Sequence, residues 1–122
     1  MNVNFSLKQD DLSQSFQSKG IFKDSSLTFY DDNNAYHKLE ITKNSIRYKK
    51  QGETEIDFTF ELDKIHSGLY KVQGLAIKFD IKTTRLLKTA HSISVIYDLL
   101  QENQRINTVH FTIEFSMIEG GL

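Results

Sequence analysis

The sequence has 122 residues, no cysteine or tryptophan, and 15 basic against 16 acidic residues, which gives a formal net charge of −1. The length predicts one domain over residues 1–122, and the lack of cysteine excludes disulfides, thiolate metal sites and a cysteine nucleophile. The balanced charge argues against nucleic acid or an anionic membrane surface as a partner.

Apolar residues recur at every second position along most of the chain, which is the pattern of strands with one buried face. In chain order, the runs lie at residues 3–7, 27–29, 38–42, 46–48, 55–62, 75–81, 93–99 and 109–117. Turn-forming clusters separate them: KDSS, YDDNN, TKNS, KKQGE, KIHSG, VQG and QENQ. We expect the ambiguous segment 83–92 to continue a strand through a bend, and no segment predicts a helix.

Strands this short and this closely spaced form either a sandwich or a closed barrel. The hairpin spacing, without a long Greek-key connection, favours an all-β fold consisting of one closed antiparallel barrel of about 8 to 10 strands. Such an interior is either filled by side chains or admits one small ligand. Bulky inward positions such as Phe58, Phe60 and Phe111 favour filling.

A few polar side chains share the inward parity of their strands: His37, Tyr48, Thr83, Arg85 and Tyr97. We expect the two tyrosines to bury their rings and direct their hydroxyls to water or to a backbone carbonyl. His37 is expected to be a structural histidine with satisfied hydrogen bonds.

Arg85 allows two interpretations. If the alternation continues, its guanidinium lies at the barrel mouth and can bind a carboxylate or phosphate. If the alternation slips at Thr83 and Thr84 through a bulge, Arg85 faces solvent. His66 is expected in an exposed loop, where a position near Tyr70 would suit a ligand contact.

Catalytic and metal-binding patterns are weak. The four histidines share no metal-ligand spacing, no serine lies in a GxSxG elbow, and GETEID is an acidic turn rather than a phosphate loop. We therefore expect no metal and no cofactor. An enzyme is the least favoured function, because the only inward titratable candidates for a base or nucleophile are His37 and the tyrosines. The first residues, MNVNFSLKQDD, lack the basic and then apolar pattern of a signal peptide, and no apolar run is long enough to cross a bilayer, so we expect a cytoplasmic protein.

From about Asn44 to Phe115 the order of features resembles the YwiB-like family of small bacterial proteins of unknown function. The resemblance lies in SIRYKKQGE, FELDKIHSGLYKV, GLAIKFDIKTTRL and ISVIYDLL, with Gly74, Thr83 and Tyr97 at matching places. It implies a calycin-like, lipocalin-like barrel, and it carries over no catalytic residue or ligand.

Two functions are favoured over an enzyme. In the first, the barrel binds a small amphipathic or anionic molecule at its mouth, through candidates drawn from Arg85, His66, Tyr70, Thr83, Tyr97 and His37. In the second, a barrel filled with side chains is a non-enzymatic interaction or scaffold protein that acts through its outer surface or a homodimer interface. The sequence leaves open whether the protein is a monomer or a homodimer.

Overall fold

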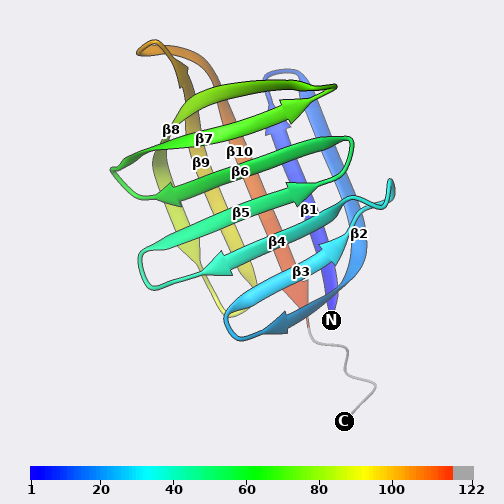
Figure 1. The fold of residues 1–122 in the computed structure, drawn as a ribbon. Helices are drawn as coiled ribbons and strands as arrows, with labels where there is room; N and C mark the ends of the chain where they lie inside the picture. Colours follow the sequence, from blue (N-terminus) through cyan, green and yellow to red (C-terminus); the bar gives the residue numbers. More distant parts are fainter. Residues whose placement is uncertain (117–122) are drawn as a thin grey trace.

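The computed structural model describes residues 1–116, which form a closed antiparallel barrel in which each strand pairs with its neighbours in the chain and β1 pairs with β10 (Figure 1). The strands are β1 (Asn2–Gln9), β2 (Leu12–Lys23), β3 (Ser26–Tyr30), β4 (Tyr36–Ile41), β5 (Ser45–Gln51), β6 (Thr54–Glu61), β7 (Ile65–Val72), β8 (Leu75–Lys88), β9 (Ser92–Gln101) and β10 (Gln104–Ser116). The predicted all-β barrel is confirmed. Residues 1–116 contain no helix that is long and apolar enough to span a membrane.

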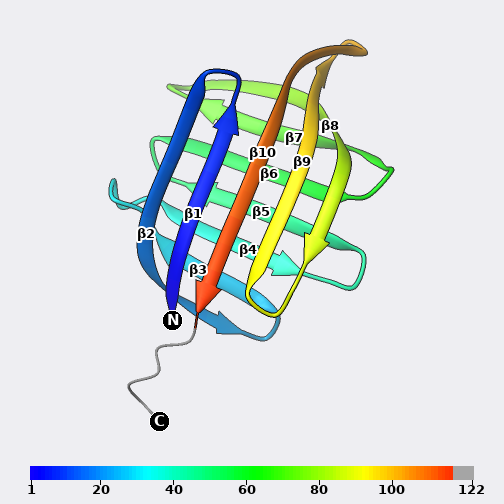
Figure 2. The ribbon, with the colours of Figure 1, turned by 180° about the vertical axis from the view of Figure 1, so that it is seen from behind.

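The barrel is flattened into two layers whose strands cross at a steep angle. Strands β3 to β7 form the front layer in Figure 1, and β1, β9 and β10 run behind them with most of β2 (Figure 2). Two long strands join the layers at the corners. β2 pairs with β1 up to Lys19 and with β3 from Gly20 onward, while β8 pairs with β7 and then with β9. Strands that change partners at bends are the usual way to build such corners.

Tight turns join several of the strands. Both residues between β2 and β3 (Asp24, Ser25) and both between β9 and β10 (Glu102, Asn103) have positive φ angles. Two positive φ angles are the mark of the two-residue turns that match the twist of a β-hairpin. The clusters KDSS, VQG and QENQ were therefore correctly predicted as turns.

Two strands were not predicted. β2 has the exposed polar sequence LSQS at its start, and its few apolar residues do not alternate strictly, so its period is weak. β7 contains the sequence IHSG, which was interpreted as a turn. The glycine in it has a packing reason: a Cβ atom on Gly68 would lie 2.5 Å from Cδ1 of Phe58.

Aromatic side chains fill the middle of the barrel. The rings of Phe5, Tyr48 and Phe60 surround Phe111, with centroid separations of 5.2, 5.1 and 6.0 Å respectively. The buried core also contains Val3, Leu27, Phe29, Leu39, Ile46, Phe58, Ile81, Ile93, Val95, Tyr97, Val109 and Ile113. Aromatic pairs at these distances contribute beyond the area they bury. The filled interior agrees with the prediction from the bulky inward residues.

Candidate functional site

A pocket of about 680 Å³ lies at the end of the barrel where the chain begins, which is the lower end in Figure 1. Its wall is made by parts of the chain that are far apart in sequence: the start of β1, the corner of β2, the end of β4, the turn between β8 and β9, and the end of β10. The lining residues are Met1, Gly20, Ile21, Phe22, Ile41, Lys88, Thr89, Ala90, His91, Ile93 and Phe115.

Most of this wall is apolar. Ile93 belongs to the buried core, and Ile41 and Phe115 pack against it. Phe22 stacks on Phe115 with ring centroids 6.2 Å apart, yet it remains 45% exposed, and its neighbour Ile21 is 67% exposed. Consecutive strand residues face opposite sides of a sheet, so Phe22 lies on the inner side of β2, where it stacks on Phe115, whereas Ile21 lies on the other side opposite Thr28.

Lys88 supplies a cationic group at the pocket. Its ammonium donates hydrogen bonds to the backbone carbonyls of Thr42 at 2.6 Å and Lys43 at 2.8 Å. These bonds join the end of β8 to the turn between β4 and β5. Because an ammonium has three donors, one remains for another acceptor.

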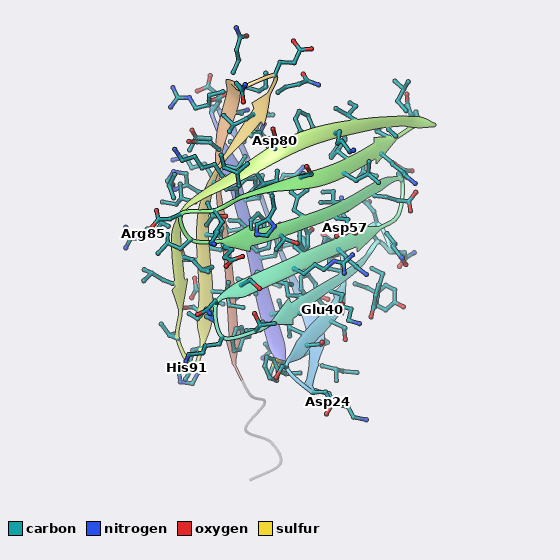
Figure 3. All side chains as sticks on the ribbon, turned by 60° about the vertical axis from the view of Figure 1, so that its left-hand side comes forward. Asp24, Glu40, Asp57, Asp80, Arg85 and His91 are labelled. Carbon is teal, nitrogen blue, oxygen red and sulfur yellow. The ribbon has the colours of Figure 1, made fainter. Side chains whose placement is uncertain are left out.

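The turn between β8 and β9 is held firmly in place. The Thr89 hydroxyl accepts hydrogen bonds from the backbone N–H groups of His91 and Ser92. The His91 carbonyl in turn accepts the N–H of Phe115 at 2.9 Å. His91 is exposed at the lower end of the molecule, as Figure 3 shows. The pocket therefore has a fixed wall with Lys88 and His91 on the same side.

The N-terminal ammonium of Met1 adds a second cationic group, and it donates to the carbonyl of Gly20 at 3.1 Å. Among the described lining residues there is no aspartate or glutamate. An apolar pocket with cationic groups and without carboxylates favours a ligand that has an apolar body and an anionic group.

A second polar feature lies inside the barrel. The Tyr48 hydroxyl donates to Nδ1 of His37 at 2.8 Å, and Nε2 of His37 donates to the carboxylate of Asp31 at 2.9 Å. The same carboxylate accepts the backbone N–H groups of Asn33 and Ala35. The network thus joins the loop between β3 and β4 to His37 of β4 and Tyr48 of β5.

The chemistry of this network is structural. Burial raises the pKa of Tyr48 well above its ordinary value, which makes its hydroxyl a poor base and a poor nucleophile. Burial also lowers the pKa of His37 despite the hydrogen bond and charge of Asp31, so the imidazole stays neutral and its two nitrogens keep distinct roles. The hydrogen bonds expected of His37 are present at both of its ring nitrogens. The Tyr48 hydroxyl, however, bonds to His37 rather than to water or a carbonyl.

The predicted rim residues do not gather in one place. The register of β8 against β9 shifts between Thr83 and Arg85, so Thr83 and its partner Tyr97 are buried while Arg85 is exposed. This is the bulge that one interpretation predicted, and Figure 3 shows Arg85 at the outer side of the barrel, far from His91. Tyr70 is partly buried against the core.

The expected loop position of His66 was wrong. His66 lies in β7 opposite Ile81 and donates to Glu61 at 2.9 Å, because the strand begins at Ile65 immediately after a short turn. None of the six predicted ligand-binding residues lines the pocket at the lower end. Within residues 1–116, no three histidine, aspartate or glutamate side chains come close enough to hold a metal ion.

Sequence reasoning missed the pocket residues for a physical reason. Ile21 and Phe22 are consecutive, so they do not fit the alternation of a strand, and the other lining residues come from distant strand ends and from the turn between β8 and β9. The one local signal was segment 83–92, which contains Lys88 and His91 and whose secondary structure was ambiguous from the sequence.

Among solved structures, the fold is similar to that in the crystal structure of the YwiB protein from Bacillus subtilis. The TM-score is 0.63 with 13% sequence identity, and the alignment covers 95% of this chain and 89% of that one. At this identity the similarity shows a shared fold. No curated protein matches the sequence. A family model described as a domain of unknown function, DUF1934, matches residues 3–113. This match covers most of the chain, and the protein therefore belongs to the DUF1934 family.

Proposed function

We propose that this protein binds a small amphipathic molecule with an anionic head group in the pocket at the lower end of the barrel. The observation that carries the proposal is the combination of an apolar wall with the Lys88 ammonium at its edge. The binding site is the end pocket rather than the barrel middle, since aromatic rings fill the middle.

The apolar body of such a ligand would cover Phe22 and Ile21. Both are among the exposed large hydrophobic side chains of the barrel. Removing apolar surface from water contributes about 25 cal/mol per Å², so a chain of ten or so carbons contributes several kcal/mol before the cost of ordering it.

The anionic head would lie at Lys88 and His91. The carbonyls of Thr42 and Lys43 hold the Lys88 ammonium in place before a ligand arrives, which lowers the entropic cost of binding. A hydrogen bond to a charged group contributes about 1.5–3 kcal/mol. We therefore expect charge to decide which amphipathic molecules bind.

The experiment is a calorimetric titration with dodecanoate, and with dodecyltrimethylammonium as the probe of opposite charge. Saturable one-to-one binding of dodecanoate alone is expected. Lys88→Met keeps the apolar stem and removes the charge, so it should weaken dodecanoate binding about tenfold. Lys43→Met, which changes an exposed lysine outside the pocket lining, is the control and should leave binding unchanged. Equal affinity for the two probes would contradict the proposal. So would an equal loss of dodecanoate affinity in Lys88→Met and Lys43→Met.

A second candidate function is a non-enzymatic interaction protein that works as a homodimer. The filled interior and the exposed pair Ile21 and Phe22 favour it, because a second copy would cover these side chains. Light scattering on Phe22→Ser decides between the two. A wild-type dimer that the variant dissociates supports the second function, and a wild-type monomer excludes it.

A further inference from the structure

The backbone pairing between β6 and β7 is incomplete. Register pairs join Thr54–Asp57 to Leu69–Val72, and then the ladder stops. Residues 58–61 of β6 and 65–68 of β7 therefore face each other without a regular ladder, although each strand keeps its pairing on the other side. This stretch, in which residues 58–61 and 65–68 face each other, is called the seam. Backbone N–H and C=O groups that face it need partners other than those of a β-ladder.

A polar pocket of about 310 Å³ lies over the seam on the outer face. Its lining residues are Arg47, Asp57, Thr59, Ser67, Gly68, Leu69 and Lys78. Arg47 and Asp57 are engaged with each other through two hydrogen bonds of 3.0 and 2.9 Å. Gly68 also lines this pocket, and a side chain on it would point inward against Phe58 and Ile81.

Two contacts close the seam from within and at its end. The Phe58 ring occupies the space that a side chain on Gly68 would need. His66 bonds to Glu61 across the open end, where both side chains are partly exposed. Each contact depends on one side chain, so the seam is closed by far fewer interactions than a full ladder provides.

An unpartnered hydroxyl lies opposite Tyr97, whose ring packs near that of Phe58. Within the described part of the chain, Oγ1 of Thr83 is the only buried side-chain polar atom without a hydrogen-bond partner, and Thr83 is 1% exposed. Thr83 lies at the open end of the seam, since its carbonyl accepts the N–H of Asp63 in the turn between β6 and β7. It is paired with Tyr97, whose ring packs 6.1 Å from that of Phe58. A buried hydroxyl without a partner marks a place for a hydrogen-bonding guest.

We propose that the seam between β6 and β7 is a side entrance through which a small, uncharged, hydrogen-bonding molecule reaches the Thr83 hydroxyl. Water is the smallest such molecule. The entrance is separate from the pocket at the lower end and does not depend on its function. A full charge is excluded, because the interior around Phe58 and Tyr97 is apolar and would not solvate it.

The test uses the lack of cysteine in the chain. In Thr83→Cys the single thiol replaces the unpartnered hydroxyl, and in Val95→Cys it replaces an equally buried residue of β9 away from the seam. Each variant is treated with methyl methanethiosulfonate, which is small and neutral, and with its charged sulfonatoethyl analogue. We expect the neutral reagent to modify Thr83→Cys at least about tenfold faster than Val95→Cys, because local opening is more frequent than global unfolding. The charged reagent should show no such preference.

Adding His66→Ala to Thr83→Cys should raise the rate with the neutral reagent further, with no change in the Val95→Cys background. Equal rates at both positions would overturn the proposal, as would equal acceleration in both backgrounds. If Thr83→Cys does not fold, hydrogen exchange of the wild type provides the readout. Faster exchange of the amides in 58–61 and 65–68 than in the paired part of the same strands supports the entrance, and uniform protection overturns it.

Discussion

The imidazole of His37 stacks on the ring of Phe29, with centroids 4.8 Å apart and planes 7° from parallel, while both of its nitrogens are hydrogen-bonded. His37 is only 2% exposed, and its ring is held by this stacking and by a hydrogen bond at each nitrogen. Buried polar groups that are fully paired make a core specific, whereas the loss of one partner is costly.

Removal of Asp31 should therefore destabilise the protein strongly. Asp31→Ala leaves the Nε2–H of His37 and two backbone N–H groups without their acceptor. We expect the free energy of unfolding to fall by about 2–4 kcal/mol. Urea denaturation measures it. Asp32→Ala, at the exposed neighbouring position, is the control and should change stability by less than about 0.5 kcal/mol. Similar values for the two variants would show that the network is not structural.

Stability should also depend on pH through His37. Burial lowers the pKa of His37 in the folded protein, so on acidification the unfolded chain takes up the proton first. The contribution of His37 is fully present above its ordinary pKa of about 6.5 and is lost as the pH falls through the lower folded value. The imidazole C–H resonances of His37 should titrate below that ordinary value. A His37 resonance that titrates at or above it would contradict this account.

The corner at Gly20 should not tolerate a side chain. A Cβ atom there would lie 2.7 Å from Cγ2 of Val3 and 3.0 Å from the backbone oxygen of Thr28, which cannot move independently. Gly20→Ala should cost about 1–3 kcal/mol of stability in thermal or urea unfolding. The cost should shrink in a Val3→Ala background, because the two sites are in contact. If the stability losses of Gly20→Ala and Val3→Ala simply add in the double variant, the corner is not closely packed.

The exposed ion pair of Arg47 and Asp57 should contribute little to the free energy of unfolding. The two side chains are 46% and 41% exposed, and solvent screens their attraction even though the guanidinium binds both carboxylate oxygens. We expect Arg47→Ala to change the free energy of unfolding by less than about 1 kcal/mol. A loss of several kcal/mol would mean that the pair holds the strands beside the seam together.

The fold could be predicted because alternation is a local signal. The run that begins at Leu75 keeps its parity as far as Thr83, where Ile81 and Thr83 are buried in the structure as expected. The bulge that follows was visible as two consecutive threonines, but only the paired strand shows which way Arg85 then points.

The candidate site could not be predicted in the same way. Met1, Ile41, Lys88 and Phe115 meet only because four separate chain segments end at the same edge of the barrel. No spacing between residues in the sequence predicts that these four segments lie side by side. The seam between β6 and β7 was hidden for a related reason, since Gly68 signals a turn unless the position of Phe58 is known.

The most direct test of the proposed function is a titration of isoleucine methyl resonances with dodecanoate. Ile41 and Ile93 line the pocket, and Ile81, which pairs with His66 and Leu99, is buried in the barrel core away from the pocket wall. We expect the methyl signals of Ile41 and Ile93 to shift in a saturable manner while those of Ile81 stay in place. Unchanged spectra, or shifts centred on Ile81, would contradict binding at the end of the barrel.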